Sequence, residues 1–478
     1  MKIMKLKNLI ECPSELENLK ITGVTCDSRQ VKEGFIFVCI KGALSDGHTF
    51  AQAAAADGAA VVIAEEDTGL KNQIIVSDTH AAFAEISAKW FGNPSESLKL
   101  IGVTGTNGKT SITYILKKIL EALGYKVGLI GTIQNMICDE IIEAKNTTPN
   151  AYDLNDLFSQ MKKKGCTYVI MEVSSHALDQ CRVYNLPFDI AMFTNLTQDL
   201  LDYHKTMENY LEAKKKLFKM CKTAIINSDD EYAEKIMEGL DCKIVTYSTG
   251  NNSTNSAKAI QYSPDGVKFE FVSDTDICHI KVNTGGKFTV YNTMCAISCA
   301  VELGLPLKEV AKAIAELKGI KGRAEVVPTN KDFTVIIDYA HTPDGLKNIL
   351  TTFRECRKSR LTVVFGCGGD RDKTKRPIMG SIAARYADNV IITSDNPRSE
   401  DPMAIIDDIL VGLDGTTTPY RVIENRVEAI KYAVATAAKD DIIVLAGKGH
   451  ETYQILKDGT IHLDEREVVA EALKEQEC

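Results

Sequence analysis

A glycine-rich turn between an apolar run and an amphipathic run constrains this chain more than any other feature. The apolar residues 98–103 predict a buried strand, and residues 111–123 have the spacing of an amphipathic helix. Gly105 and Gly108 lie between them and allow the turn to curl, so that successive backbone N–H groups point inward. Such a nest of N–H groups at the start of a helix attracts phosphate.

The residues that follow the turn favour a P-loop. Lys109 would reach the outer phosphates of a nucleotide, and the Thr110 hydroxyl would hold Mg²⁺. The match is loose because Val103 stands where the strict pattern has its first glycine, and the alternative is a glycine turn with an incidental lysine. Because strand, turn, Gly-Lys-Thr and helix come in the required order, we expect a nucleotide site. Its candidate ATP-binding residues are Gly105, Thr106, Asn107, Gly108, Lys109, Thr110 and Ser111.

Length and charge limit the domain count and the class of partner. A chain of 478 residues exceeds one hydrophobic core and predicts about three domains of roughly 150 residues. Its 44% hydrophobic and 25% charged residues are typical of a soluble globular enzyme. The net charge of −9 argues against nucleic acid, so small molecules are the expected partners. We expect a monomer.

The leading segment and the cysteines predict a cytoplasmic protein. Residues 1–20 carry scattered charges and lack the apolar core of a signal peptide. No apolar run approaches the length of a transmembrane segment. The fourteen cysteines include no CxxC pair, which favours reduced thiols over zinc ligands or disulfides.

Alternating strands and helices predict an α/β protein with a small N-terminal α/β domain and a central P-loop-type ATPase domain. Near the N-terminus we expect strands at 35–40 and 60–64, a helix at 49–57 and a linker at 93–97. The middle section predicts a largely parallel sheet with helices on both faces. Its expected strands are 126–130, 168–173, 189–194, 224–227 and 243–247, with an antiparallel pair at 267–272 and 277–282. Its expected helices are 151–164, 208–221 and 290–303.

The alternation of strands and helices begins again near residues 319–323 and predicts a Rossmann-like C-terminal domain. Four apolar strands are expected at 335–338, 361–365, 390–393 and 442–445. Each ends in a polar or glycine-rich turn, which is where open α/β sheets bind ligands. The predicted domains are therefore 1–97, 98–321 and 322–478.

Two polar clusters follow strands of the central domain. Glu172-Val-Ser-Ser-His176 would place a carboxylate beside the phosphates to hold a cation, although a helix N-cap segment explains it equally well. Residues 195–204 would supply metal or substrate contacts, but alone they are more typical of a polar loop.

Four turns end the C-terminal strands and together would form a pocket that carries both Arg and Glu. An amino acid needs this mixture, since cations bind its carboxylate and an anion binds its amine. Four unrelated surface loops are the alternative. The turns are residues 338–344, 366–372, 395–398 and 447–451.

With these motifs in place, the chain resembles the Mur ligases of peptidoglycan synthesis along its whole length. The matching segments, in order, are 105–110, 172–176, Gly322-Arg-Ala-Glu325, 338–344 and Gly447-Lys-Gly-His-Glu451. The resemblance implies an N-terminal domain for uridine diphosphate, a central ATPase and a C-terminal domain for the incoming amino acid. It also implies ATP-driven amide formation through an acyl phosphate, with ADP and phosphate as by-products.

The resemblance implies roles for individual residues. Asn292 would read adenine, although Thr289 stands where an asparagine is common, and Arg323 and Asp338 would contact the nucleotide. The expected residues for UDP-muramyl-dipeptide are Ser28, Arg29, Thr147, Thr148, Ser174, Gln180 and Arg182. The expected metal-site residues are Thr110, Glu172 and Lys214, and the expected catalytic residues are Lys109, Lys214 and His341.

Lys214 matches a lysine that the family carries as a carbamate, an anion that can bridge to Mg²⁺. The residues alone would make any lysine of 214–216 a solvated helix residue. Leu200 departs from the family, which has a metal-holding histidine there. His204 lies four residues on, but the family has its own histidine at that position too. We hypothesise a weakened second metal site.

Asp395-Asn-Pro-Arg398 indicates which amino acid is added. The Arg398 guanidinium suits the second carboxylate of meso-2,6-diaminopimelate, which L-lysine lacks. The resemblance implies that this amino acid is joined to UDP-N-acetylmuramoyl-L-alanyl-D-glutamate. Its expected contacts are Arg371, Asp395, Asn396, Pro397, Arg398, Gly447 and Glu451. The alternatives are an L-lysine-adding ligase, another amide ligase on the same scaffold, such as a folylpolyglutamate synthase or the ligase that adds the terminal dipeptide, or a nucleotide-switch binding protein.

Overall fold

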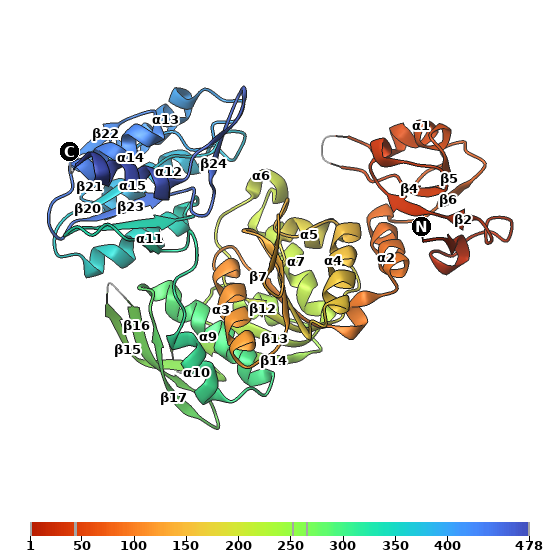
Figure 1. The fold of residues 1–478 in the computed structure, drawn as a ribbon, viewed down its shortest axis with the longest axis horizontal. Coiled ribbons are helices and arrows are strands. Elements are labelled where there is room, and N and C mark those ends of the chain that lie inside the picture. Colours follow the sequence, from red (N-terminus) through yellow and green to blue (C-terminus); the bar gives the residue numbers. More distant parts are fainter. Residues whose placement is uncertain (1, 43–44, 251–252, 264–265, 477–478) are drawn as a thin grey trace.

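The computed structural model describes residues 2–42, 45–250, 253–263 and 266–476, and these form three α/β units in chain order (Figure 1). We name them the N-terminal unit (β1–β6, α1 and α2), the central unit (β7–β17 and α3–α10) and the C-terminal unit (β18–β25 and α11–α15). The central unit lies between the other two. The predicted three-domain α/β fold is confirmed. The sheets fall inside the three predicted segments, whose boundaries stay a prediction.

The N-terminal unit contains a parallel four-stranded sheet. In order across the sheet, its strands are β3 (Gly23–Thr25), β4 (Phe35–Val38), β5 (Ala59–Ala64) and β6 (Gln73–Ile75). Helix α1 (Ala51–Ala56) and helix α2 (Thr79–Phe91) accompany it, and β1 (Met4–Lys5) pairs with β2 (Lys20–Ile21). Trp90 of α2 packs in the core together with Ala151, which begins α4 of the central unit.

The central unit is built on an eleven-stranded sheet that is parallel from β8 to β15 and antiparallel at both edges. In spatial order its strands are β10 (Glu140–Ile142), β9 (Asn135–Ile137), β8 (Val127–Ile130), β11 (Tyr168–Glu172), β7 (Lys99–Thr104), β12 (Phe188–Phe193), β13 (Cys221–Asn227), β14 (Lys243–Ser248), β15 (Asn255–Ser263), β16 (Gly266–Val272) and β17 (Ile277–Val282).

Helices cover both faces of this sheet, as predicted, and each face has its own apolar core. One core includes residues of α3 (Lys109–Ala122), α9 (Lys287–Glu302) and α10 (Leu307–Ala315). The other core includes residues of α4 (Ala151–Lys163), α5 (Ser175–Asp179), α7 (Met207–Lys215) and α8 (Ala233–Met237), near the short helix α6 (Leu201–His204).

One predicted helix of the central unit needs correction, and three of its strands were missed. The helix expected over 208–221 ends at Lys215, and a 3₁₀ turn (Lys216–Met220) leads into β13. Leu217 and Phe218 are buried in the core, and Cys221 already pairs with Phe188 in the sheet, so the chain straightens there. Strands β9, β10 and β15 were not predicted, because β9 and β10 are short and β15 is largely polar.

The C-terminal unit has a six-stranded sheet in which only β18 runs antiparallel to its neighbour. In spatial order the strands are β18 (Glu325–Val327), β19 (Thr334–Asp338), β23 (Ile442–Ala446), β20 (Leu361–Phe365), β21 (Asn389–Ile392) and β22 (Tyr420–Val422). The four predicted strands are confirmed as adjacent parallel strands, so their following turns share one edge. The helices are α11 (Pro343–Cys356), α12 (Lys375–Tyr386), α13 (Pro402–Leu410), α14 (Arg426–Ala435) and α15 (Glu465–Glu475).

A short hairpin, β24 (Tyr453–Leu456) with β25 (Gly459–His462), lies outside the main sheets. Within the described part of the chain, no helix combines the length and the apolar character that crossing a bilayer requires. The twelve cysteines that the structure characterises there are free thiols.

Candidate active site

The predicted P-loop connects β7 to α3, and its two glycines are required by close neighbours. Gly105 has a φ of +145°, and a Cβ there would lie 1.8 Å from the Thr194 hydroxyl. Gly108 has a φ of +88°, and a Cβ there would lie 2.4 Å from Oδ1 of Asn292. A side chain at either position would therefore collide with another segment, in a backbone region that glycine adopts at little cost.

The loop is held by the end of β12, which the sequence did not indicate. The backbone N–H groups of Thr106 and Asn107 donate to the carbonyl and side-chain oxygens of Asn195, at 2.8 and 2.9 Å. Thr194 donates to the Asn107 carbonyl at 2.7 Å. These two N–H groups are therefore occupied within the protein.

Two lysines converge on one carbonyl of the loop. Lys109 Nζ donates to the carbonyls of Gly105 and Thr106, both at 2.8 Å, and Lys214 Nζ donates to Gly105 at 2.9 Å. Lys214, on α7, is only 1% exposed, so it is not a solvated helix residue. Burial, followed by the Lys109 ammonium, lowers the pKa of Lys214 well below its usual value. An amine in this setting loses its proton more readily than an exposed lysine does.

Glu172 ends β11, the strand between β8 and β7, and its carboxylate is 1% exposed. It accepts hydrogen bonds from the backbone N–H of Thr132 at 2.9 Å and from the Thr132 hydroxyl at 3.0 Å. Burial lowers the pKa of Lys109, and the Glu172 carboxylate acts in the opposite direction. Ser174 caps α5 by accepting from Ala177 N–H, so the cluster at 172–176 is both a carboxylate site and a helix N-cap.

Leu200 has a φ of +54° at the start of α6 and packs, partly buried, against the apolar core. The His204 ring hydrogen-bonds the Ser175 hydroxyl at 2.8 Å and stacks on Tyr210. Among the described side chains, no three His, Cys, Asp or Glu residues gather in an arrangement that could hold a metal ion. A metal here would therefore depend on other donors, such as a hydroxyl or a modified lysine.

The nucleotide residues come from two units. Asn292 projects from α9 toward Gly108, and Arg323 Nη2 donates to the Thr110 hydroxyl at 2.9 Å. The Arg323 guanidinium lies 4.8 Å from the Tyr339 ring centre. Asp338 accepts from the Ala324 N–H at 2.7 Å. Asn292 of the central unit and Arg323 of the C-terminal unit thus meet at the P-loop, and Asp338 contacts the residue next to Arg323.

Two further predicted residues are His341, expected to be catalytic, and Ser111 of the expected nucleotide site. His341 is exposed, and its Nδ1 hydrogen-bonds the Tyr339 carbonyl at 2.8 Å. Ser111 lies in the first turn of α3. A further contact between the units was not predicted: Asn107 donates to the Asp344 carboxylate at 2.8 Å.

A cavity of about 150 Å³ lies between the N-terminal and central units. Cys26, Ile40, His80 and Phe83 line it from one side, and residues of the central unit, among them Gln180 and Arg182, line it from the other. Ser28 and Arg29 follow Cys26 closely in sequence, and the Arg29 guanidinium pairs with Asp27 at 2.8 Å. Gln180 and Arg182 thus line the cavity, whereas Ser28 and Arg29 are not among its lining residues.

The residues expected to contact muramyl-dipeptide form one connected network in the central unit. Thr147 and Thr132 hydroxyls lie 3.1 Å apart, and Thr132 in turn donates to Glu172. Thr148 donates to the Glu172 carbonyl at 2.8 Å and accepts from the Ser174 N–H at 3.1 Å. Arg182 donates to the Thr148 carbonyl at 2.8 Å and, at 2.7 Å, to Gln180. All five predicted residues are therefore brought together beside Glu172.

The predicted amino-acid residues surround the turns after β20, β21 and β23. Asn396 Nδ2 donates to Glu451 Oε2 at 2.9 Å, and Arg398 Nη1 donates to the Gly369 carbonyl at 2.7 Å. Gly447 has a φ of +115°, and a Cβ there would lie 2.5 Å from Asp395 Oδ2. Asp395, Asn396 and Pro397 are buried.

Arg371 and Arg398 flank Gly368, where a Cβ would lie 2.9 Å from Arg398 Nη1 and 3.9 Å from Arg371 Cγ. Arg371 is exposed and donates to the Asp370 carbonyl at 2.9 Å. The segment 395–398 is held by the unpredicted hairpin, because Arg398 N–H donates to the Ile455 carbonyl at 3.1 Å and Gln454 donates to the Asp395 carbonyl at 2.6 Å. Lys448, also unpredicted, contacts both Asn396 and Glu451.

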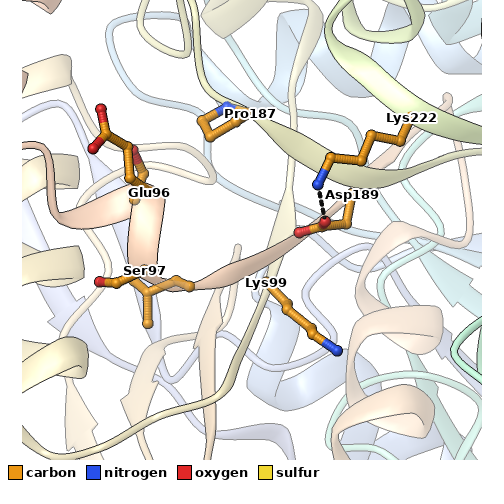
Figure 2. Close-up of a pocket in the computed structure, with 8 residues that line it drawn as sticks. Glu96, Ser97, Lys99, Pro187, Asp189 and Lys222 are labelled. Carbon is orange, nitrogen blue, oxygen red and sulfur yellow. Dashed lines mark hydrogen bonds and ion pairs between the residues drawn. The ribbon is translucent and has the colours of Figure 1, made fainter.

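A second cavity, of about 250 Å³, lies at the opposite, amino-terminal end of the central strands (Figure 2). Asp189 in its wall accepts from Lys222 Nζ at 2.7 Å and from the Leu100 N–H at 3.1 Å, at an irregularity in the pairing of β7 with β12. This arrangement joins three strands and is remote from the carboxyl edge that carries the P-loop.

Three family models match the chain. They describe the Mur ligase family catalytic domain (residues 20–91), the Mur ligase middle domain (103–300) and the Mur ligase glutamate ligase domain (322–449). The chain belongs to the Mur ligase family and is an ATP-dependent ligase that forms an amide bond.

Curated relatives and a solved structure are consistent with this family. The UDP-N-acetylmuramoyl-L-alanyl-D-glutamate–2,6-diaminopimelate ligase of Caldanaerobacter subterraneus subsp. tengcongensis is 49% identical over 464 residues, which are 96% of each chain. The ligase of that name from Clostridium botulinum is 47% identical over 468 residues, also 96% of each chain. A solved structure of a ligase with this name is 34% identical, covers 100% of both chains and has a TM-score of 0.73.

Proposed function

We propose that this chain joins meso-2,6-diaminopimelate to the D-glutamyl γ-carboxylate of UDP-N-acetylmuramoyl-L-alanyl-D-glutamate, in the synthesis of peptidoglycan precursors. The observation that carries the proposal is the arrangement of Arg398, Asn396 and Glu451 at one sheet edge. Arg398 and the Asn396 amide offer N–H donors for a carboxylate, and Glu451 offers an acceptor for an amine. Relatives of 46 to 49% identity that bear this amino acid in their names support it.

The proposed reaction has two steps, and the first must overcome repulsion between two anions. The γ-carboxylate attacks the γ-phosphate of ATP, which gives an acyl phosphate and ADP. The amine of diaminopimelate then attacks the acyl carbon, and phosphate leaves as the amide forms. The first step brings two anions together, and Lys109 at the P-loop would offset their repulsion and stabilise the charge on the transferred group. Closure of the units around the reactants would exclude water, which would hydrolyse the acyl phosphate.

Thr110, Glu172 and a carbamylated Lys214 would hold Mg²⁺. The fit rests on two observations: Glu172 is a buried carboxylate that acts electrostatically on Lys109, and the buried Lys214 amine has a lowered pKa. Only a neutral amine reacts with CO₂, and the product is an anion suited to a hard cation. When bound, Mg²⁺ would supply positive charge between the carboxylate and the triphosphate.

The two-sided cavity between the N-terminal and central units supports a UDP-sugar site. Ser28 and Arg29, two and three positions after the lining residue Cys26, would contact the uridine diphosphate. Thr147, Thr148, Ser174, Gln180 and Arg182 would hold the muramyl-dipeptide, whose terminal carboxylate would then lie toward Glu172 and the P-loop.

We propose a monomer as the working form. We also place the reaction in the cytoplasm, because ATP is its co-substrate. Sedimentation of the protein, with and without substrates, tests the oligomeric state. A stable dimer under assay conditions would contradict it.

Two other functions make different predictions. An L-lysine-adding ligase would leave the half-buried Arg398 guanidinium without a carboxylate partner, which should weaken binding of lysine. A nucleotide switch would hydrolyse ATP without UDP-muramyl-dipeptide or an amino acid. Neither is favoured by the Arg398, Asn396 and Glu451 arrangement.

The test is ADP release with each substrate omitted in turn, followed by mass analysis of the nucleotide product. We expect release to require both UDP-muramyl-dipeptide and diaminopimelate. Arg398→Ala should lose most of the preference for diaminopimelate, whereas Arg357→Ala, which removes an ion pair with Asp388 elsewhere in the C-terminal unit, should keep it. Equal wild-type rates with lysine and diaminopimelate would contradict the proposal.

A further inference from the structure

Lys448 is a buried lysine to which the proposed mechanism gives no role. Its side chain has no exposed surface, and Nζ donates to Asn396 Oδ1 at 2.9 Å and to Glu451 Oε2 at 3.0 Å. A buried ammonium is costly unless it is paired and hydrogen-bonded. Both partners of Lys448 are amino-acid-site residues, so the fold places this charge directly behind that site.

The contacts of Lys448 determine which way the Asn396 amide points. Asn396 Oδ1 accepts from Lys448 and also from the Ile455 N–H at 2.9 Å. Turning the amide over would set its NH₂ group against two donors, so this orientation is strongly preferred. Asn396 Nδ2 donates one hydrogen to Glu451 and keeps its second hydrogen for a ligand.

The same lysine orients Glu451. Both donors, Lys448 Nζ and Asn396 Nδ2, lie on Oε2, so Oε1 is the oxygen that would accept from a ligand amine. Because Lys448 has no exposed surface, it acts on the ligand through these two residues and does not touch it.

We propose that Lys448 is a positioning residue of the amino-acid site: it holds the Asn396 amide with its NH₂ group toward the ligand and leaves Oε1 of Glu451 as the accepting oxygen, and thereby favours an amino acid with a second carboxylate. The inference rests on the proposed function. Without Lys448, the Asn396 amide keeps only its contacts with the Ile455 N–H and Glu451, so its orientation is less strongly fixed. A larger share of molecules with the amide oxygen toward the ligand would weaken binding of a carboxylate and lessen the disadvantage of lysine.

The test measures KM for each substrate, and the ratio of kcat/KM for diaminopimelate over L-lysine, in Lys448→Met. We expect KM for diaminopimelate to rise about tenfold or more and the ratio to fall about as much, with KM for ATP within about twofold of wild type. Lys448→Gln keeps one hydrogen-bond donor for Asn396. Its kcat/KM ratio should lie between those of wild type and Lys448→Met. Lys117→Met, which removes another buried lysine, paired with Glu121, is the matched control and should leave the ratio unchanged.

A double-mutant cycle with Asn396→Ala separates positioning from a general structural role. If Lys448 acts through Asn396, the two changes together will cost clearly less than the sum of their separate effects on the ratio. Additive effects, an unchanged ratio, or equal rises of KM for ATP and diaminopimelate would overturn the inference. If Lys448→Met does not fold, Lys448→Gln is judged by the same ratio. A wild-type protein that does not use diaminopimelate would instead overturn the proposed function.

Discussion

Arg323 donates a hydrogen bond to the hydroxyl of Thr110 at 2.9 Å, although 213 positions separate the two residues in the chain. The contact joins the Gly322–Glu325 segment, which packs on the C-terminal unit, to the first turn of α3. The same hydroxyl is the one proposed to hold Mg²⁺, so Mg²⁺ and the guanidinium would lie close together beside the phosphates. We therefore expect nucleotide binding to depend on the position of Arg323.

Arg323→Ala should raise KM for ATP by about tenfold to a hundredfold, because hydrogen bonds of a charged group contribute about 1.5–3 kcal/mol. KM for diaminopimelate should change much less. ADP-release kinetics measure both constants, and Arg354→Ala, an exposed arginine of α11, serves as the control. An unchanged KM for ATP would show that Arg323 does not contact the nucleotide.

Gly108→Ala should impair ATP binding selectively. The new Cβ would lie 2.4 Å from Asn292 Oδ1, at a φ of +88°. Gly124 is a matched control, since its φ is +86° and a Cβ there meets nothing within 4 Å. Both variants should lose about 1 kcal/mol of stability from backbone strain, but only Gly108→Ala should raise KM for ATP, by about tenfold or more. Similar KM values for the two variants would refute the role of the P-loop contact.

Lys214 should be carbamylated at neutral and mildly alkaline pH. Because burial and Lys109 lower its pKa, the neutral amine that reacts with CO₂ persists to lower pH than in an exposed lysine. As pH falls through the lowered pKa, the ammonium form returns and activity should decline. Removal of CO₂ and bicarbonate should reduce activity, and their return should restore it.

A ¹³C NMR signal from ¹³C-bicarbonate, present in wild type and absent in Lys214→Ala, would identify the modified residue. Lys216→Ala removes an exposed lysine paired with Asp179 and should keep the signal. A wild-type protein without a carbamate signal and indifferent to CO₂ would contradict the prediction.

Leu200→His tests the hypothesis of a weakened second metal site. Leu200 packs against the apolar core, and leucine has no group that coordinates a metal. The histidine should lower the Mg²⁺ concentration for half-maximal rate several-fold, a difference of about 1 kcal/mol. Leu201→His places the same ring one residue along and should have no such effect. If Mg²⁺ affinity and rate stay at wild-type values in Leu200→His, the hypothesis fails.

His450 should make the protein sensitive to acid. Burial, followed by the cations Arg323, Lys321 and Arg466, lowers the pKa of His450 to about 3. Below pH of about 6.5 the unfolded chain binds a proton at this residue and the folded chain does not, so the free energy of unfolding falls as pH falls. The slope from this group is about 1.4 kcal/mol per pH unit until pH approaches 3.

Calorimetry at pH 7 and pH 5 should show a smaller loss in His450→Gln than in wild type, by about 2 kcal/mol. His462 gives the opposite sign, because Glu467 raises its pKa and its stabilisation is lost as pH rises. Identical pH profiles for wild type and His450→Gln would argue against a buried neutral imidazole.

The parts of the site that could be predicted from the sequence have local signals. The P-loop is recognisable because strand, turn, lysine and helix follow one another within a few residues. The C-terminal turns were expected to meet because four apolar strands in parallel must share an edge, and Asn396, Arg398 and Glu451 do lie together. The muramyl-dipeptide residues were brought in by family resemblance and form one network.

The parts that could not be predicted depend on contacts between distant segments. Nothing local distinguishes Lys448, between two glycines of a turn, from an exposed lysine, and its burial depends on Asn396, fifty-two positions earlier. The amphipathic spacing of α7 continues past Lys215, but pairing of Cys221 with Phe188 ends the helix sooner. The close approach of Thr194 to Gly105 is likewise a property of the folded sheet alone.

The P-loop and the amino-acid turns lie on separate sheets, and this limits what a fragment of the chain can do. A fragment that carries β7–β17 would contain Lys109, Thr110, Glu172 and Lys214, but not Arg323 or the residues around Glu451. Such a fragment would keep only part of the nucleotide site and would lack the amino-acid site. The ATP site and the amino-acid site are complete only in the intact polypeptide. A truncated product is therefore not expected to couple ATP hydrolysis to amide formation.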